Sequence, residues 1–485
     1  MRRFFFLLFT SAFMPGCARY QRAPLSAAAL ATEFTSRRLD DSGLRQFLTR
    51  YGSLHGATSA DSDWHPRDLA LVALYYNAEL DSARAVLGSA RAAEITAGQR
   101  PLPSIGANIA RASKADEGKS SVWSSMLTAG LTLELGGKRG ARRDAARART
   151  LATALGLENV AWRVALDAEG AAVTVAAADR DAVNARAERD ALTSVLRLLR
   201  ARYTEGSISI ADVARAEADV RSVTLSLIQA ERARLDARNS LARAVGIPVE
   251  RALVPQARPD SVAGCVAITA LPEMHGILRD SLQLLALQRR LDVGTALADY
   301  AAAEASVRLE VANRYPDLVL TPGFGWNQGI AQWSLGLMLP TLVINRNVGL
   351  LAEAEARRTS VAARFEHVQQ LAIQDVGAAL LECDGAREQL TAADSLVRNS
   401  QQQLDLAEAA YRRAETGQTE VALTHLAVVR ALRAQQTAQA RNAVAGIVIE
   451  RAVGGWFAGP SLPFDDVLIS ARRTAETMHD TTQTP

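Results

Sequence analysis

The stretch LTLELGGKRGARRDAARART, residues 131–150, decides how the fold of this chain is interpreted. It begins with alternating apolar residues, turns at two glycines and continues as an alanine-rich run with many arginines. Period-two alternation is typical of a strand, and alanine with arginine favours a helix. A phosphate-binding P-loop would need glycine at position 132 and Ser or Thr at 139, but the chain has threonine and arginine there. The stretch therefore predicts a basic joint between a strand and a helix, without a nucleotide site.

The composition favours long helices over a compact mixed fold. Aromatic residues make up 5% of the 485 residues, while alanine and arginine are abundant. The formal net charge of +3 is small for this length, and basic residues are interspersed with acidic ones. A nucleic-acid-binding role is therefore not indicated.

The N-terminal segment MRRFFFLLFTSAFMPGC, residues 1–17, reads as a secretory signal. Arg2 and Arg3 precede a short apolar run that is too short to span a bilayer stably. Its end resembles the lipobox of bacterial lipoproteins, which implies that Cys17 becomes a lipidated first residue. The alternative is ordinary cleavage nearby and an inert Cys17. No other stretch approaches about 18 uninterrupted apolar residues, so helices are not expected to cross a membrane.

Two further cysteines, Cys265 and Cys383, could pair in an exported chain, but nothing local in the sequence indicates it. Cys383 lies on an apolar helical stripe, so we predict that it serves buried packing.

Proline and glycine spacing predicts an internal duplication with an offset near 210 residues, roughly as Pro103 is followed by Pro316 and Gly206 by Gly417. Each copy reads as helix, two strands, long helix and return helix. We expect the first copy at residues 66–250 and the second at 273–455, joined by a linker at 251–272. The segment 18–65 is expected to be periplasmic, and 456–485 is a C-terminal tail.

Within the copies, we expect helices at about 68–100, 141–201, 274–313 and 350–413, and strands at about 105–112, 122–135, 318–326 and 330–339. After the turns RYTEGSISIADV and ETGQTEVALTHL, return helices are expected to end near Val245 and Val453. In the second strand Trp123, Leu127 and Leu131 share one face, and Ser124 and Thr128 share the other. Such alternation over about 10 residues is typical of a transmembrane barrel strand. A half-buried strand of a soluble sheet alternates equally well, but four strands between very long helices favour the barrel.

Four strands cannot close into a barrel alone, and unpaired edges are costly in a bilayer. The chain is therefore expected to oligomerise, and three copies with 12 strands form the smallest assembly that leaves room inside. The long helix at 350–413 carries an apolar stripe with steps of three and four, which is coiled-coil spacing. Its members are Phe365, Val368, Ala372, Val376, Ala379, Cys383, Ala386, Leu390, Ala393, Val397, Leu404, Ala407 and Tyr411.

Five segments carry a family resemblance: NAEL at 77–80, LTLELGGKRGARRDAA, RYPDLVLTPGFGW, WSLGLMLP with NRNVGLLAEAEARR, and the two glycine-centred turns. They resemble the TolC-type outer-membrane efflux family over residues 66–453, and most closely its heavy-metal efflux branch. The resemblance implies a mainly helical fold with a small β part: a homotrimeric 12-stranded β-barrel in the outer membrane, continued by a coiled-coil helical tunnel in the periplasm.

The resemblance also implies the function and the partners. The chain would be the passive exit duct of a tripartite efflux system, fed by a proton-driven inner-membrane pump through a periplasmic adaptor. The alternatives are a duct for protein secretion and a pore-less, lipid-anchored coiled-coil scaffold. No enzymatic activity and no cofactor are expected, because the six histidines are scattered and no catalytic motif is present.

Three sets of site residues follow from this reading. The basic residues Lys138, Arg139, Arg142, Arg143 and Arg346 are expected at the periplasmic rim of the membrane, close to lipid headgroups; a plain solvated helix start is the alternative. The turns are expected to form tips that contact the adaptor, with plain helix breakers as the alternative. These turns comprise Tyr203, Thr204, Glu205, Gly206, Glu415, Thr416 and Gly417.

The third set is a possible periplasmic gate. Well-studied family members carry aspartates six and nine residues after the second glycine, where this chain has Leu423 and Leu426. Asp212 lies six residues after Gly206. A leucine ring that closes the tunnel by excluding water would replace the acidic ring.

Overall fold

The computed structural model describes residues 22, 24–51, 64–251, 265, 275–339 and 347–455. Contacts divide the chain into two units, Met1–Arg38 and Leu39–Pro485. The first unit holds helix α2 (Ala27–Ser36), whose first turn is capped by the Ser26 side chain. The predicted signal segment with Cys17, and Arg346 of the basic set, lie outside the described residues.

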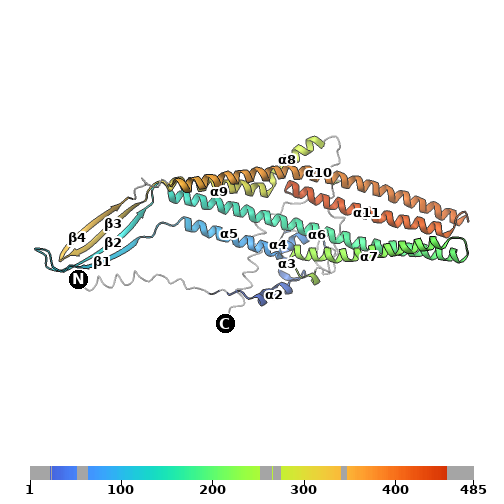
Figure 1. The fold of residues 1–485 in the computed structure, drawn as a ribbon, viewed down its shortest axis with the longest axis horizontal. Helices are drawn as coiled ribbons and strands as arrows, with labels where there is room; N and C mark the ends of the chain where they lie inside the picture. The colour runs from blue at the N-terminus through green and yellow to red at the C-terminus, as the bar shows by residue number, and fades with distance from the viewer. Residues whose placement is uncertain are drawn as a thin grey trace. The chain divides into compact units, whose positions relative to one another are not determined.

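The second unit contains the predicted duplication (Figure 1). After α3 (Ser42–Tyr51), the first copy has six elements: α4 (Pro66–Tyr76), α5 (Ala78–Ala97), β1 (Ser104–Arg111), β2 (Trp123–Leu133), α6 (Lys138–Thr204) and α7 (Ile210–Val245). A short 3-10 turn, Val249–Arg251, follows. The second copy repeats the order with α8 (His275–Arg289), α9 (Leu291–Ala312), β3 (Leu318–Asn327), β4 (Ile330–Met338), α10 (Val348–Arg412) and α11 (Gln418–Val453).

The first helix of each copy is broken, where the sequence predicted continuous helices at 68–100 and 274–313. Asn77 and Arg290 take an extended conformation at the two breaks, and each is the N-cap of the helix that follows. Each break lies against the end of a return helix: Asn77 Nδ2 donates to Ala244 O at 3.0 Å, and Arg290 Nη1 donates to Ala452 O at 3.4 Å. Tertiary contact, which helix propensity does not record, therefore decides the break.

The glycines that end the return helices explain how the breaks fit. Gly246 and Gly454 cap α7 and α11 in the left-handed conformation. A Cβ on Gly246 would lie 2.8 Å from Tyr76 O, and one on Gly454 would lie 2.8 Å from the Cα of Arg290. Only glycine allows this close approach together with a positive φ.

The four strands form one antiparallel sheet in the order β1-β2-β3-β4. β2 pairs with β3 and thereby joins the two copies, with Leu127 opposite Phe324. β1 and β4 are the edge strands, and their residues are exposed throughout. At the far turn, Gln328 and Gly329 both have positive φ, as a two-residue hairpin of the preferred type requires.

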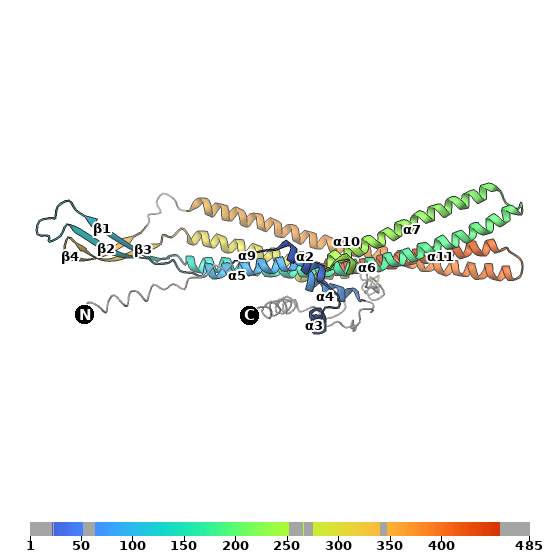
Figure 2. The same cartoon turned by 90° about the horizontal axis from the view of Figure 1, so that it is seen from below.

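The helices of this unit run alongside one another, with the sheet beyond one end and the α6–α7 and α10–α11 turns at the other (Figure 2). α6 has 67 residues and α10 has 65, which corresponds to about 100 Å each at 1.5 Å per residue. α6 contacts α7, α9 and α11, and α10 contacts α9 and α11. The two long helices thus span the distance between the sheet and the turns.

The helices pack through small residues, as the apolar stripe of the long helix predicted. Val376, Ala379, Cys383 and Ala386 are buried in one cluster that α8, α10 and α11 share. In the first copy, Ala161, Ala165, Ala168 and Ala172 are fully buried against α4 and α7. Alanine at these positions lets the helix backbones approach closely, which is why long helices can be held together with few aromatic residues.

The structure corrects the prediction that Cys383 serves packing alone. Cys265 and Cys383 form a disulfide with their Cα atoms 5.4 Å apart. Both residues are fully buried in the cluster that α8, α10 and α11 share. The bond ties a residue of the segment between the copies to the middle of α10, at a sequence separation of 118 residues. The sequence contained the two thiols but no local signal that they meet.

We expect Cys383→Ser, Cys265→Ser and the double substitution to destabilise the protein by the same amount, about 2–5 kcal/mol, because each removes the same cross-link. The midpoint of denaturant unfolding, followed by circular dichroism, measures the effect. Wild-type protein unfolded under reducing conditions is the matched control and should coincide with the variants. A midpoint unchanged by any of these changes would contradict the structural role of the bond.

Candidate functional site

The sheet presents an apolar face to its surroundings. On β2, Trp123, Leu127, Leu131 and Leu133 are exposed, and Ser124, Thr128 and Thr132 of the opposite face are partly covered. On β4 the exposure is larger, with Trp333 at 83% and Leu335 at 73%. Side chains of this kind left in contact with water would be unfavourable, so the face is suited to an apolar environment such as hydrocarbon.

Aromatic residues gather at the end of the sheet that is remote from the helices. The ring of Phe324 lies 4.9 Å from that of Trp326 and 4.5 Å from that of Trp333. Across the sheet, the guanidinium of Arg111 lies 5.7 Å from the ring centre of Trp123. Aromatic rings with an adjoining cation are typical of the level where a bilayer meets water.

The basic joint at the other end of the sheet is held by contacts within the chain. Lys138 is buried, and its Nζ lies 2.7 Å from a carboxylate oxygen of Asp317, just before β3. Arg142 forms a two-pronged pair with Glu134, just after β2. Arg139 Nε donates to Gly98 O at 2.7 Å, at the C-terminus of α5 where a cation is favoured.

These contacts answer why a strand passes to a helix through so many cations. Three of the four described basic residues connect the start of α6 to β2, to the segment before β3 and to the end of α5. Arg143 is partly buried beside Gly98. The basic residues of the joint therefore hold the start of α6 against the sheet and α5; we call this set of contacts the clamp. An interaction of these residues with lipid headgroups stays a prediction.

The two turns at the far end are built alike, but their correspondence differs from the one expected. Gly206 N donates to Tyr203 O and Ala414 N to Tyr411 O, both at 2.9 Å, and φ is +74° at Gly206 and +59° at Ala414. Gly206 therefore corresponds to Ala414, an offset of 208 residues. Gly417 instead has an extended conformation and caps α11, the place that Ser209 takes for α7.

The predicted tip residues lie together at these turns, and most are exposed. Tyr203, Thr204, Glu205 and Gly206 are all exposed, as are Glu415 and Gly417, while Thr416 is partly covered. Arg413 pairs with Glu415 through Nε at 2.8 Å, so the second turn carries a surface ion pair. The arrangement leaves both turns free for contact with another molecule.

The predicted gate residues occupy different environments. Asp212 is partly exposed and forms a capping box with Ser209, whose hydroxyl donates to the carboxylate at 2.7 Å. Leu423 is 43% exposed. Leu426 is buried, packing in a cluster with Ala191, Leu192 and Val223. Of the two leucines, Leu423 alone has a largely exposed side chain.

A seam of ion pairs between α6 and α11 was missed by the sequence reasoning. Arg433 bridges Asp181 at 2.8 Å and Glu188 at 3.0 Å, and Arg430 reaches Glu188 at 2.8 Å. Asp167 pairs with Arg451 at 2.6 Å further along. These carboxylates lie on α6 and the arginines on α11, so the seam joins the two copies through complementary charge. The seven-residue spacing of Asp181 and Glu188 was a signal that could have identified this face.

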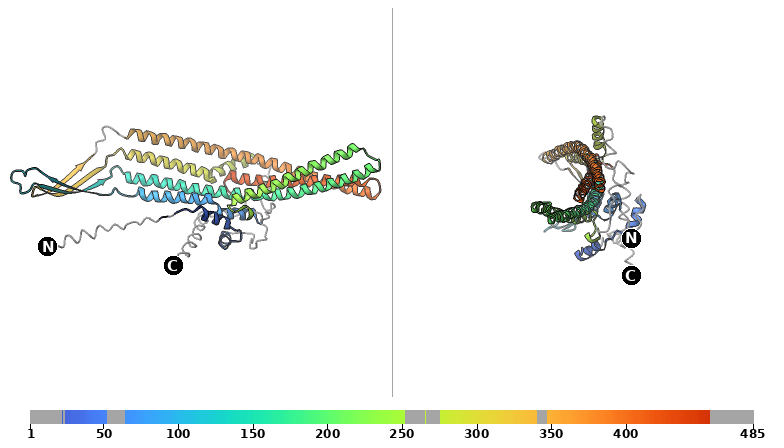
Figure 3. Two further views of the ribbon diagram at one scale, coloured as in Figure 1. Left: turned by 60° about the horizontal axis from the view of Figure 1, so that its bottom comes forward. Right: turned by 90° about the vertical axis from the view of Figure 1, so that its right-hand side faces the viewer.

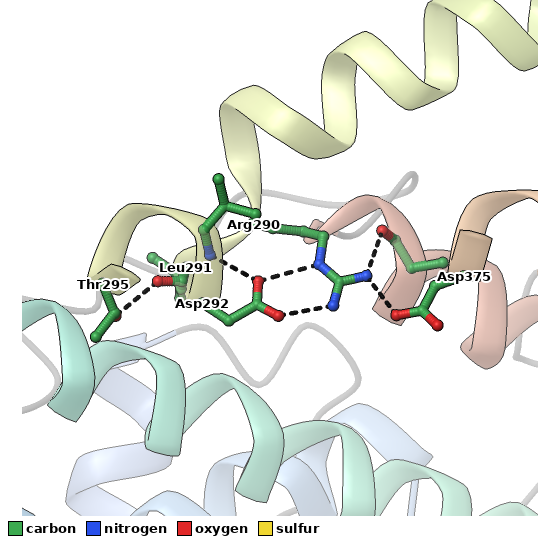
Figure 4. A network of polar contacts seen from close by, with 7 residues as sticks. Arg290, Leu291, Asp292, Thr295 and Asp375 are labelled. Atoms are coloured by element: carbon green, nitrogen blue, oxygen red, sulfur yellow. Dashed lines mark hydrogen bonds and ion pairs between the residues drawn. The ribbon is translucent and has the colours of Figure 1, made fainter. Parts of the chain in front are cut away.

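A second polar cluster lies where the second copy is broken (Figure 4). The guanidinium of Arg290 contacts Asp292 at 2.7 Å and Asp375 at 2.8 Å. Burial by itself would lower the pKa of Arg290, but the hydrogen bonds to both carboxylates raise it, so the side chain stays charged. In the first copy Arg67, near the start of α4, lies between Glu169 at 3.5 Å and Glu450 at 3.2 Å. The Arg290 cluster lies at the break of the second copy, and the Arg67 cluster joins the start of α4 to α6 and α11.

The described residues contain no cluster of three or more His, Cys, Asp or Glu side chains placed to hold a metal ion. In the same parts of the chain, no helix has the length and apolar character needed to cross a bilayer.

Comparison with known proteins gives a consistent family. The family model described as "Outer membrane efflux protein" matches residues 70–247 and 282–455. The pyoverdine export outer membrane protein OpmQ of Pseudomonas aeruginosa is 27% identical over 285 residues, which are 56% of this chain and 57% of OpmQ. The outer membrane protein OprJ of the same organism is 31% identical over 166 residues, 30% of this chain and 34% of OprJ. The chain thus spans between a third and little more than half of these relatives.

Among solved structures, the fold is similar to that of CusC, with a TM-score of 0.64 at 19% identity, over 90% of this chain and 99% of CusC. At this identity the likeness shows the fold alone.

We expect the matched substitutions Gly206→Ala and Ala414→Gly to have opposite effects on the turns. A side chain in the left-handed conformation costs roughly 1–2 kcal/mol, so the first substitution should destabilise its turn and the second should relieve strain. Amide hydrogen exchange of the two turns, measured by mass spectrometry, reports the change. Equal and same-sign effects would contradict the assigned correspondence.

The capping box gives α7 a pH-dependent start. The hydrogen bonds from the Ser209 hydroxyl and backbone N–H, and then the charge of Arg215, lower the pKa of Asp212 below its ordinary value of 3.8. The ionised Asp212 therefore stabilises the start of α7 fully above its ordinary pKa of 3.8. This stabilisation is lost as the pH falls through the lower pKa that Asp212 has in the folded protein. Exchange of the first amides of α7, corrected for intrinsic rate, should accelerate in that range. The variant Asp212→Asn should lack this pH response; an identical response would contradict the role of Asp212.

Proposed function

The chain belongs to the outer membrane efflux protein family, a family of channels and not of enzymes, and from this we propose that it is the outer-membrane exit duct of a tripartite efflux system. One observation carries the proposal: an apolar sheet with two open edges lies at the end of helices about 100 Å long. The apolar face of the sheet is suited to a bilayer, and the charged surface of the helices is suited to an aqueous compartment. Neither a soluble enzyme nor a solitary scaffold needs this combination.

Three subunits together close the sheet into a barrel. The edge strands β1 and β4 expose backbone groups that cost several kcal/mol each when unpaired in hydrocarbon. Pairing β4 of one subunit with β1 of the next subunit leaves no unpaired edge strand. Three subunits of four strands each give 12 strands. A barrel of that size encloses a passage, whereas 8 strands are filled by side chains. The helices then continue the passage as a tunnel.

The partners follow from the two ends. We propose that the turns at Gly206 and Ala414 contact a periplasmic adaptor protein, since both are exposed and their backbone allows close approach. The adaptor would connect the duct to a proton-driven inner-membrane pump, which supplies the energy. At the other end, Lys138, Arg139, Arg142, Arg143 and Arg346 would lie at the level of the lipid headgroups, where the clamp at the joint resists movement of α6 into hydrocarbon.

We propose that the periplasmic end is closed by apolar side chains. Leu423 is exposed near the start of α11, and Leu426 supports it from within the packing of its own subunit. A ring of leucines narrows a tunnel and excludes water from it. Asp212 would contribute to this end through the start of α7.

Cys17 would carry a lipid anchor in the outer membrane. The support is the lipobox-like sequence before it. Labelling cells with a radioactive fatty acid tests this directly. The wild-type chain should take up label and Cys17→Ser should not, while Cys383→Ser, as the control cysteine variant, should remain labelled.

For the cargo, we propose membership of the heavy-metal efflux branch, on the sequence resemblance. The relative OpmQ is named for pyoverdine export, so a siderophore is the competing cargo. A deletion strain should become sensitive to transition-metal ions and recover when the gene is returned. Loss of siderophore secretion with normal metal tolerance would overturn this assignment and leave the duct intact.

Purified protein in a planar bilayer should show discrete conductance steps, because a closed 12-stranded barrel contains water. On a gel it should migrate as a trimer that dissociates on heating. A silent bilayer together with a monomeric protein would contradict the duct and favour the lipid-anchored scaffold.

A further inference from the structure

The four helices that extend to the far turns form an arc with two uncovered ends. Contacts run from α10 to α11, from α11 to α6 and from α6 to α7. In the end-on view of Figure 3 the orange helix α10 and the green helix α7 lie at the two ends of the arc. Both helices carry leucines on faces that their own chain leaves exposed: Leu225 at 57% and Leu235 at 48% on α7, and Leu381 at 68% and Leu396 at 49% on α10.

The duplication provides a template for how these faces are covered. Within the chain, α6 of the first copy packs against α11 of the second. In that seam Glu188 pairs with Arg433 at 3.0 Å, and Val173 shares an apolar cluster with Ala443. Helix α10 is the counterpart of α6, and α7 is the counterpart of α11. A seam between α10 of one subunit and α7 of a neighbouring subunit would therefore repeat the α6–α11 contact that exists within the chain.

The correspondence of positions is fixed by the packing. With the offset of 208 residues between Gly206 and Ala414, Ala168 corresponds to Val376 and Val245 to Val453, and all four are fully buried. Leu196 likewise corresponds to Leu404, both 7% exposed. The same offset holds at the helix ends, where Gly246 and Gly454 both take the left-handed conformation.

The same offset relates each position of the α6–α11 seam to a position on α10 or α7. Charged residues of that seam correspond to leucines there. Glu188 corresponds to Leu396 and Arg433 to Leu225, so an ion pair inside the chain becomes a pair of exposed leucines. Val173 corresponds to Leu381 and Ala443 to Leu235, so small apolar residues become larger ones. The exposed leucines of α7 and α10 thus fall at the positions that meet in the template.

We propose that a second copy of this chain covers these faces, with Leu225 against the partner subunit's Leu396 and Leu235 against the partner subunit's Leu381. The proposal rests on the proposed trimer and adds the register and the chemistry of its helical interface. The seam within a subunit combines ion pairs with apolar clusters, and the proposed seam between subunits has leucines at the positions of the Glu188–Arg433 pair. Burying these exposed leucines against one another would favour association of separate chains, which must offset the entropy lost on binding.

Other occupants fit these faces less well. Leu396 lies 48 residues into α10, about 72 Å from its membrane-side end at 1.5 Å per residue, so lipid is too distant. Leu235 lies 25 residues into α7, roughly 38 Å from the far turn, so a partner that contacts only the tips does not reach it. The second copy is the occupant that accounts for both faces at once.

Disulfide cross-linking in isolated outer membranes tests the register. The pair Leu225→Cys and Leu396→Cys should give covalent dimers and trimers of the 51.9 kDa chain on a non-reducing gel. The matched control pairs Leu225→Cys with Gln403→Cys, which lies on the same face of α10 but two turns, about 10.5 Å, away. The control and both single variants should remain monomeric after denaturation.

Equal cross-linking in the control pair, no cross-linking in the Leu225–Leu396 pair, or a cross-link to a protein of different mass would overturn the proposal. Its failure is distinguishable from that of the duct. A wild type that is trimeric and conducting while the cysteine pair stays unlinked refutes the register alone. A wild type that is monomeric and silent refutes the proposed function as well.

A charge exchange gives a second, independent measurement. Leu225→Arg or Leu396→Glu alone should lower the temperature at which the trimer dissociates on a gel, because each places one charge in an apolar seam. The two together recreate the Arg433–Glu188 pair of the α6–α11 seam and should recover at least half of the lost temperature. Single variants with an unchanged dissociation temperature, or a double variant weaker than both, would overturn the proposal.

Discussion

The unpaired backbone of two edge strands is the constraint on which the rest of the structure depends. On their outer sides, β1 and β4 each present a row of N–H and C=O groups that pair with no other strand among the described residues. In water such an edge invites aggregation, and in hydrocarbon it is costly. The apolar outer face suits the sheet to hydrocarbon, and in the proposed trimer other subunits close its edges. Each feature below the sheet, from the clamped joint to the long helices, then has a place in a ring of subunits.

The two copies break their first helix and reverse their long helix in the same way. They differ in the residues that hold these features. Both copies break their first helix where a left-handed glycine ends the return helix. Yet the first break is held by an asparagine and the second by an arginine between two aspartates. The turns also differ, because alanine takes in the second copy the conformation that glycine takes in the first. The proposed ring would thus contain two kinds of seam built from two copies of one repeated unit.

Much of the architecture was predictable because hydrophobic periodicity is a local property. Period-two alternation located β2 and β4, and the stripe around Val376 predicted the buried face of α10. The breaks at Asn77 and Arg290 were missed because tertiary contact, and not propensity, ends those helices. The Cys265–Cys383 bond and the α6–α11 ion pairs were missed for the same reason, since each joins residues remote in sequence. Gly417 was paired with Gly206 because both are glycines of the turns, although Ala414 takes the left-handed conformation that Gly206 has.

The bond between Cys265 and Cys383 sets an order of events in the life of the chain. Thiols stay reduced in the cytosol, and the oxidising compartment lies beyond the inner membrane. The segment between the copies can therefore be fastened to α10 only after both cysteines have been exported. Maturation of the second copy is in this way coupled to the supply of oxidant in the receiving compartment. A cell that starves that supply would hold newly exported chains at an unfinished stage, before any ring is assembled.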